Sequence, residues 1–264
     1  MNKKYLFDLR VVSNESINGH YNLLKLTSDT EVLPAMSPGQ FVEVRIDDSP
    51  VTLLRRPISI HYVDRVRNEI WLLILPIGHG TRRMARYRKG DVVNVMLPLG
   101  CGFTIPRHKD VNTENLLLVG GGVGVAPMLY LGEALRDAGF SPLFLIGARS
   151  ADGIVRQVDY AKYGEVYIST EDGSVGERGF VTDHTIWKEQ SFGYIYACGP
   201  KPMMIAVAKR ARQLGTYCEV SLENKMGCGI GACLCCVEDT IDAGHVCVCT
   251  EGPVFNMDRL KWPI

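Results

Sequence analysis

The chain has 264 residues, enough for two domains and a small extra module, and its 29 basic and 29 acidic residues give a formal net charge of zero. It lacks the basic surplus that indicates a nucleic-acid-binding protein. The nine cysteines are an odd number, and no apolar segment of signal-peptide length follows Met1. We therefore expect reduced thiols in a soluble, cytoplasmic protein.

Residues 5–99 are predicted to form short β-strands separated by turns. Segments 41–46, 70–75 and 92–97 have the alternating or continuous apolar pattern of strands, and clusters of Gly, Pro, Asp and Asn lie between them. Many short strands with few helical periods are typical of a small antiparallel β-barrel, which is the fold that we expect here.

Two motifs in this region could bind a phosphate group. Arg56 and Ser59 lie in one extended segment, and the fork of an arginine matches phosphate oxygens or a flavin ribityl chain. Gly80 and Thr81 stand at the start of a predicted helix over residues 81–87, where free N–H groups could bind an anion. Each motif also has an ordinary structural interpretation, as an exposed arginine at a barrel edge or as an N-capped turn.

The middle of the chain predicts an α/β domain with a parallel sheet. The apolar run 116–119 is typical of a strand covered on both faces, and a glycine-rich turn and a predicted helix over 128–138 follow it. This arrangement brings backbone N–H groups to a dinucleotide pyrophosphate, here at Gly121, Gly122 and Gly124. Because the motif is not the strict Gly-x-Gly-x-x-Gly, a glycine turn that only packs is the alternative. Strand-like segments recur at α/β spacing, at 142–147, 165–169 and 193–197.

A second nucleotide motif ends the last of these strands. Cys198, Gly199 and Pro200 follow the apolar run 194–197 and precede a predicted helix. Ligands of open α/β sheets bind at the carboxyl ends of the strands, so a nicotinamide ring could lie against these residues. A cysteine at such a position is usually an inert buried side chain, and the neighbouring sequence holds no general base. We therefore predict no catalytic nucleophile.

The C-terminal region holds cysteines at a specific spacing. Cys228-x4-Cys233-x2-Cys236, with Cys249 further along, has the plant-type spacing of thiolates that bind a [2Fe–2S] cluster. The intervening glycines allow the backbone to wrap closely around an inorganic core. A zinc site is the alternative, although zinc knuckles usually contain two Cys-x2-Cys pairs. The residue pattern alone does not choose between Cys249 and the nearby Cys247 as the last ligand.

Several of these motifs together resemble the ferredoxin–NADP reductase superfamily. They are Arg56-Pro57-Ile58-Ser59, Gly80-Thr81, the turn that begins at Gly120, and Cys198-Gly199-Pro200. The resemblance implies a multi-domain β and α/β protein. Its predicted parts are an antiparallel FAD-binding β-barrel at residues 1–106, a nucleotide-binding α/β domain at 107–218 and a small [2Fe–2S] module at 219–264.

A narrower resemblance spans nearly the whole chain. Segments 54–59, 223–233 and 249–255 are similar to the electron-transfer subunits of type B dihydroorotate dehydrogenases. This family has its last cluster ligand just before Gly-Pro-Val-Phe, which favours Cys249, and it usually has glycine where this chain has Cys235. The Cys-x2-Cys spacing favours Cys236 over Cys235. In the family, flavin contacts also come from Leu73, Ile74 and Leu75, and phosphate contacts from Gly80 and Thr81.

The resemblance implies an electron relay between NAD and a partner. Electrons would pass through FAD and the [2Fe–2S] cluster to FMN in a separate catalytic subunit, which converts dihydroorotate to orotate in pyrimidine biosynthesis. The expected assembly is a heterotetramer with two copies of each subunit. The sequence does not separate NAD from NADP, because Arg149 could face a 2′-phosphate while Glu171 and Asp172 could bind a ribose. The family implies NAD.

Two other functions share some of these features. A homologous subunit of a sulfide dehydrogenase or of an NAD(P)H:ferredoxin oxidoreductase would have the same three parts. A zinc-stabilised binding module without a redox role would require the glycine motifs to be coincidental. The identity of the partner separates the first two functions, and an absorbance spectrum separates zinc from flavin and iron.

Overall fold

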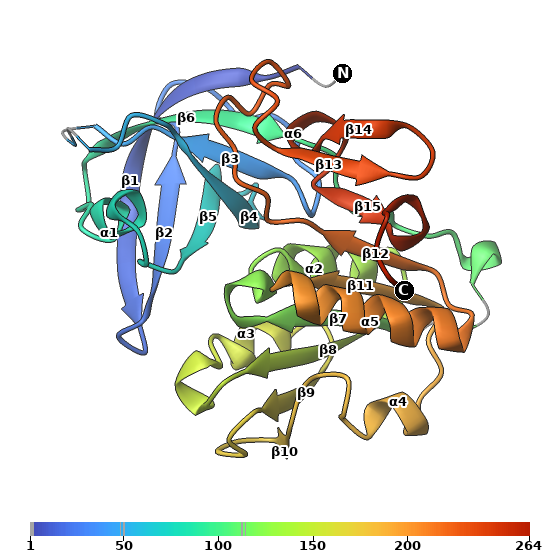
Figure 1. Ribbon diagram of the computed structural model, residues 1–264. Coiled ribbons are helices and arrows are strands. Elements are labelled where there is room, and N and C mark those ends of the chain that lie inside the picture. The colour runs from blue at the N-terminus through green and yellow to red at the C-terminus, as the bar shows by residue number, and fades with distance from the viewer. Residues whose placement is uncertain (1–2, 48, 50, 112, 114) are drawn as a thin grey trace.

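The amino-terminal region is a closed barrel of six antiparallel strands (Figure 1). The computed structural model describes every residue except 1–2, 48, 50, 112 and 114. In space the strands follow the order β1-β2-β5-β4-β3-β6, which confirms the predicted barrel. Their bounds are β1 Tyr5–Ile17, β2 Tyr21–Thr27, β3 Phe41–Val44, β4 Arg56–Asp64, β5 Glu69–Ile74 and β6 Val92–Leu99.

The helix between β5 and β6 differs from its prediction. Helix α1 spans His79–Met84, whereas the sequence predicted residues 81–87. Gly78 has an extended backbone at the N-cap position, and the Thr81 hydroxyl hydrogen-bonds the backbone N–H and carbonyl of Gly78. Thr81 is therefore the third helical residue and holds the first turn from within, instead of starting the helix.

Strand β3 is buried on both of its faces. Val42 and Val44 point into the barrel core, whereas Phe41 packs in the core that the barrel shares with the rest of the chain. Glu43 faces the same way as Phe41, because alternate residues of a strand point to opposite sides. One barrel wall is therefore an internal surface of the protein.

The remainder of the chain builds a seven-stranded sheet with helices on both faces (Figure 1). The order is β10-β9-β8-β7-β11-β12-β15, and only the pair β12–β15 is antiparallel. The predicted parallel α/β sheet is thus confirmed. The strands are β7 Asn115–Gly121, β8 Ser141–Ala148, β9 Glu165–Thr170, β10 Glu177–Arg178, β11 Tyr194–Cys198, β12 Cys218–Ser221 and β15 Val254–Asn256. The helices are α2 Met128–Asp137, α3 Gln157–Tyr160, α4 Ile186–Glu189 and α5 Lys201–Leu214.

The apolar run of β7 stabilises both layers of this region. Leu117 and Val119 pack in the core that includes α5, whereas Leu116 and Leu118 pack in the core that includes α2. Each buried side chain of this size contributes about 1.5–3 kcal/mol relative to an exposed one. Among the described residues, no helix is both long and apolar enough to cross a membrane.

The C-terminal region completes the sheet and adds a hairpin. Strand β13 (Val237–Thr240) pairs antiparallel with β14 (Gly244–Cys247), and the short helix α6 (Val248–Glu251) follows. Strand β12 runs across residue 218, where the sequence predicted a domain boundary. The division at 106/107 and 218/219 stays a prediction.

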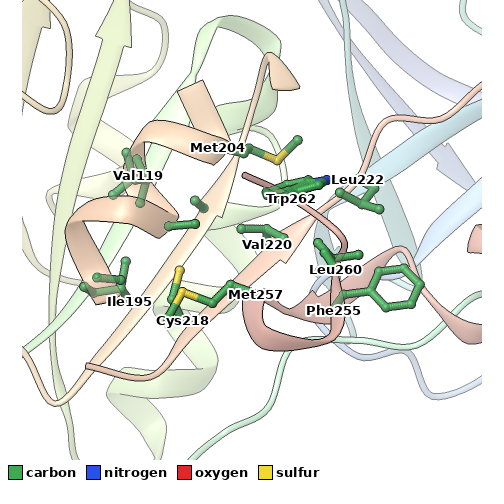
Figure 2. Packing of buried hydrophobic residues seen from close by; sticks show 14 of the residues in the cluster. Val119, Ile195, Met204, Cys218, Val220, Leu222, Phe255, Met257, Leu260 and Trp262 are labelled. Atoms are coloured by element: carbon green, nitrogen blue, oxygen red, sulfur yellow. The ribbon is translucent and has the colours of Figure 1, made fainter. Parts of the chain in front are cut away.

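The edge of the sheet is packed by the end of the chain. Figure 2 shows Phe255, Leu260 and Trp262 beside Val220 and Leu222, which lie in β12 and just after it. The same core includes Phe41 of the barrel, Leu145 of the sheet, and Cys236 and Cys249 of the C-terminal region. One continuous core therefore joins the barrel, the sheet and the cysteine-rich segment.

Candidate functional site

A cavity of about 240 Å³ lies where the barrel, the sheet and the C-terminal region meet. The barrel contributes most of the residues that were predicted to contact a flavin. The glycine turn contributes Val123 and Ala126, and the segment after β12 contributes Leu222, Glu223, Asn224 and Met226. The predicted flavin-binding residues in its lining are Pro57, Ile58, Ser59, Leu73, Ile74, Leu75 and Thr81.

The two other predicted flavin-binding residues, Arg56 and Gly80, contact each other. A Cβ atom added to Gly80 would stand 2.6 Å from Nε of Arg56, so only glycine leaves room for the arginine as it lies. The Arg56 guanidinium donates to the carbonyls of Leu54 at 2.8 Å and Arg55 at 3.0 Å. Helix α1 and strand β4 thus bring a cation next to the start of the helix, beside the cavity wall formed by Thr81.

The two predicted nucleotide motifs also lie together. A Cβ atom on Gly124 would stand 2.5 Å from the Cys198 carbonyl oxygen and from Cα of Gly199. One on Gly121 would stand 2.3 Å from Sδ of Met203, whereas Gly122 has φ +55° and open space around it. The glycines thus let the turn after β7 approach the loop Cys198–Pro200 after β11. These strands are parallel neighbours, and their carboxyl ends form one edge of the sheet.

A carboxylate that the sequence did not single out completes this edge. The Oε1 atom of Glu223 lies 4.0 Å from Sγ of the buried Cys198. Glu223 lines the cavity and is exposed at its opening, and partial desolvation of its carboxylate raises its pKa. Burial and then the Glu223 charge raise the pKa of Cys198 well above its ordinary value, so this thiol stays protonated. Glu223 follows β12, the parallel neighbour of β11, which is the signal that could have identified it.

The four predicted cluster cysteines form two pairs. Cys233 lies close enough to Cys228 to help lower its pKa, and the N–H of Cys249 donates to Sγ of Cys236 at 3.4 Å. Cys236 and Cys249 are buried, whereas Cys233 is exposed. Cys235, the neighbour that the spacing argued against, is exposed as well.

Backbone N–H groups of the loop point at these sulfur atoms. Ile230 and Ala232 donate to Sγ of Cys228 at 3.4 and 3.3 Å, and Gly231 donates to Sγ of Cys249 at 3.2 Å. Although burial opposes it, this hydrogen bonding lowers the pKa of Cys228 to about 6. Burial and the Cys236 thiol raise the pKa of Cys249 to about 12, so a metal would displace its proton on binding.

This donor set fits a two-iron cluster. Two thiol pairs with N–H donors to sulfur are what a [2Fe–2S] centre with four cysteine ligands requires. Over the described part of the chain, no three His, Cys, Asp or Glu side chains converge as the ligands of a single metal ion would. A two-iron cluster does not need such a group, because each iron takes two of the four thiolates.

Glu43 is a buried carboxyl group that the sequence did not single out. Its side chain is 0% exposed, and neither of its oxygen atoms has a hydrogen-bond partner among the described residues. It lies against the cysteine loop, because a Cβ atom on Gly229 would stand 2.9 Å from its Cγ atom. Burial, partly offset by Arg55, raises the pKa of Glu43 to about 7. Its place in the alternating segment 41–46 gave no signal of this environment.

The residues considered for nucleotide selectivity lie on neighbouring strand ends. The Asp172 N–H donates to the Arg149 carbonyl at 3.2 Å, just beyond β9 and β8. The Asp172 carboxylate accepts from the Ser174 hydroxyl at 2.6 Å. Arg149 and Glu171 are exposed. The structure therefore brings positively and negatively charged residues to the same edge of the sheet, and the choice between NAD and NADP stays a prediction.

Comparison with known proteins agrees with these features. Residues 223–261 match the family model described as the iron-sulfur cluster binding domain of dihydroorotate dehydrogenase B. The dihydroorotate dehydrogenase B (NAD(+)) electron transfer subunit of Lysinibacillus sphaericus is 40% identical over 250 residues, which cover 94% of this chain and 95% of that protein. The same-named subunit of Fusobacterium nucleatum is 41% identical over 225 residues, 83% of this chain and 85% of that one.

Solved structures show the same fold. An NADH-dependent reduced ferredoxin-NADP oxidoreductase, studied for flavin-based electron bifurcation, matches with a TM-score of 0.86 and 27% identity, over 97% of this chain and 90% of that one. A cytochrome P450 reductase of Amycolatopsis matches with a TM-score of 0.69 and 21% identity, over 81% of this chain and 67% of that one, and shares the fold alone. Through its close relatives, the chain belongs to the family of dihydroorotate dehydrogenase B (NAD(+)) electron transfer subunits.

Proposed function

We propose that this chain carries electrons between NAD(H) and the FMN of a catalytic partner subunit, in which dihydroorotate is oxidised to orotate. Its family membership, iron–sulfur domain and flavin-binding fold support this function. Bound FAD and a [2Fe–2S] cluster would supply the conversion between two-electron hydride exchange and one-electron transfer. The protein supplies the binding, the orientation and the electrostatic environment of these groups.

One observation carries the proposal: the cavity and the cysteine loop are built from the same segment. Asn224 and Met226 line the cavity, and Cys228 stands two positions after Met226. On another side, Val123 and Ala126 of the glycine turn line the same cavity. The cavity thus borders both the nucleotide edge of the sheet and the cysteines, which is the arrangement that a relay through a flavin needs.

The chain's own residues have distinct parts in this relay. Arg56, with the start of α1 at Gly80 and Thr81, would neutralise the flavin phosphates, because a guanidinium matches phosphate oxygens. Residues 57–59 and 73–75 would form the walls of the flavin site. The nucleotide would lie on Gly121, Gly122, Gly124, Cys198, Gly199 and Pro200, and the cluster on Cys228, Cys233, Cys236 and Cys249.

The exposed face of the cysteine loop would receive the partner. Ile230 is 48% exposed and Leu234 is 66% exposed, although both are apolar. Leu234 also has φ +56°, a left-handed conformation that costs a non-glycine residue about 1–3 kcal/mol. Apolar side chains held outward next to the cysteines support docking of a catalytic subunit there. The assembly with two copies of each subunit rests on the family resemblance alone.

The isolated chain and the complex together test this function. We expect the purified chain to contain FAD, iron and labile sulfide, and to reduce an artificial acceptor with NADH but form no orotate. With the FMN-containing partner added, dihydroorotate should reduce NAD⁺. Orotate formation by the isolated chain, or a colourless protein loaded with zinc, contradicts the proposal.

A second function follows from the structural match to an NADH-dependent reduced ferredoxin-NADP oxidoreductase over 97% of this chain. A subunit of an NAD(P)H:ferredoxin oxidoreductase or sulfide dehydrogenase would use the same cavity and cysteines. Purifying the chain from its native cell and identifying the protein that co-purifies in stoichiometric amounts separates the two functions. A partner with FMN in a TIM barrel supports the first function, and one rich in Cys motifs for further clusters supports the second.

A further inference from the structure

A fifth cysteine reaches the group of four. Cys247 is the last residue of β14 and the N-cap of α6, and its sulfur lies 3.9 Å from the Gly231 carbonyl oxygen. Cys247 pairs with Val237 in the hairpin, and the N–H of Val248 donates to the Cys236 carbonyl at 3.1 Å. Gly231 donates its N–H to Cys249. The sulfurs of Cys247 and Cys249 thus lie against the same residue, Gly231, and the backbone of both residues lies next to Cys236.

This position places Cys247 at one half of the expected cluster. Cys228 pairs with Cys233, and Cys236 pairs with Cys249, so each pair would hold one iron. Cys247 lies next to the second pair, because it stands opposite Val237, the residue after Cys236, in the hairpin. It is also less enclosed than Cys249, because Cys249 is 1% exposed while Cys247 is half-buried.

The local backbone explains how both sulfurs reach one place. Cys247 ends a strand and Cys249 lies in the first turn of α6, so the chain turns between them. Residues two apart on a continuous strand would share a face but stand about 6–7 Å apart along it. The turn removes this separation, and the N–H of Cys249 donates to Sγ of Cys236 at 3.4 Å.

We propose that Cys247 is a reserve ligand of the cluster, able to replace Cys249 on the iron shared with Cys236. The proposal rests on the proposed function, because it assumes that the four-cysteine site holds a [2Fe–2S] cluster. In the replacement, the Cys247 thiol would lose its proton and form an Fe–S bond, while the Fe–S bond to Cys249 would break and the Cys249 thiolate would take up a proton. No electron is gained or lost in this exchange.

Iron content and the spectrum of the reduced cluster test this proposal in the full-length chain. The variants are Cys249→Ala, Cys247→Ala and the double variant, with Cys249→Ala/Cys235→Ala as the matched control. Iron and labile sulfide per chain are measured on anaerobically purified protein, together with the EPR spectrum after dithionite reduction. Thermal melting reports whether each variant is folded.

We expect wild type and Cys247→Ala to hold about two irons per chain with the same EPR spectrum. Cys249→Ala should keep at least roughly half of that iron, with shifted EPR g-values because the ligand geometry differs. The double variant should fall to about a tenth or less, while Cys249→Ala/Cys235→Ala should match Cys249→Ala. An iron-free wild type would instead contradict the proposed cluster itself.

The reserve role is wrong if Cys249→Ala is as empty as the double variant, or if the double variant holds as much iron as Cys249→Ala. If Cys249→Ala does not fold, Cys249→Val serves in its place, because valine fills this buried position and carries no atom that can bind iron. Adding Cys247→Ala to that background should then remove the cluster. Equal iron with and without Cys247 in the valine background also overturns the proposal.

Discussion

The Cys198 sulfur and a carboxylate oxygen of Glu223 lie 4.0 Å apart at the carboxyl edge of the sheet. Cys198 ends β11, and Glu223 stands two residues after the end of β12, the parallel neighbour of β11. Glu223 also lines the cavity that is bounded by the predicted flavin-binding residues. A nicotinamide ring held against the Cys198–Pro200 loop would therefore meet a negative charge, and this charge favours the cationic ring that hydride loss from NADH leaves.

The first prediction concerns this charge. We expect Glu223→Gln to lower kcat for NADH-dependent reduction of an artificial acceptor by about tenfold, equivalent to about 1.4 kcal/mol of barrier. Glutamine keeps the size of the side chain but removes its charge. The measurement is steady-state kinetics at pH 8 on protein with verified FAD content. Glu251→Gln, at an exposed residue of α6, is the matched control and should retain wild-type kcat. An unchanged kcat in Glu223→Gln would show that the carboxylate has no part in hydride exchange.

The second prediction concerns the contact between Gly80 and Arg56. An added methyl at Gly80 would stand 2.6 Å from Nε of Arg56 and must displace the guanidinium. We expect Gly80→Ala to weaken FAD binding by about tenfold, since a charge-assisted hydrogen bond contributes about 1.5–3 kcal/mol. Titration of the FAD-free protein with FAD measures this change.

Gly78→Ala is the control for that variant, because a Cβ atom there meets nothing closer than the Thr81 hydroxyl at 3.9 Å. Gly78 has an extended backbone that alanine can adopt. Equal FAD affinity in Gly80→Ala and wild type would exclude Arg56 from phosphate binding.

The sequence predicted local structure better than contacts between distant segments. The strand pattern at 70–75 corresponds to β5, Glu69–Ile74, because alternation and apolar runs report burial directly. The α1 boundary was wrong because the role of Thr81 depends on a hydrogen bond to Gly78. The sequence pattern gave no signal for Glu43, because its surroundings come from elements that are remote in the chain. Glu223 follows a strand, but the neighbours of that strand in the sheet are likewise set by remote segments. The site motifs could be predicted from the sequence, because glycine spacing indicates close approach of the backbone to a ligand and cysteine spacing indicates metal ligation.

The third prediction separates backbone strain from packing in the cysteine loop. Gly229 and Gly244 have φ +67° and +68°, so alanine is strained equally at both positions. At Gly244 nothing lies within 4 Å of an added Cβ atom, whereas at Gly229 it would stand 2.9 Å from Glu43 and 3.1 Å from Leu99. We expect Gly229→Ala to lower the free energy of unfolding by about 1–3 kcal/mol more than Gly244→Ala does.

Urea unfolding measures that difference, and iron content shows whether the loop still holds a cluster. We expect Gly229→Ala to lose cluster iron and Gly244→Ala to retain it. The packing argument is wrong if the two variants lose equal stability, because the shared left-handed strain would then explain both.

The last prediction is a dependence of stability on pH that comes from His61. This side chain is 0% exposed in β4, and its Nδ1 atom lies 2.7 Å from the Ala126 carbonyl, so that nitrogen carries the proton and donates to the glycine turn. Burial lowers the pKa of His61 to about 4, the Ala126 hydrogen bond opposes this, and the nearby Arg156 adds to it. Asp159, which pairs with Arg156 at 2.9 Å, acts in the opposite direction.

The sign follows from proton binding. Between the unfolded pKa of about 6.5 and the folded pKa of about 4, the unfolded chain binds more protons, so stability rises with pH in this window. The contribution is fully present above about pH 6.5 and is lost as the pH falls to about 4, with an order of magnitude of about 3 kcal/mol.

We expect urea unfolding of His61→Gln to show a shallower loss of stability over this range than wild type. Its stability at pH 8 should be lower, because glutamine fills the site less well. His20→Gln, at an exposed turn residue, should follow the wild-type profile. If His61→Gln and wild type lose stability in parallel from pH 6.5 to 4, the buried imidazole is not the source of the acid sensitivity.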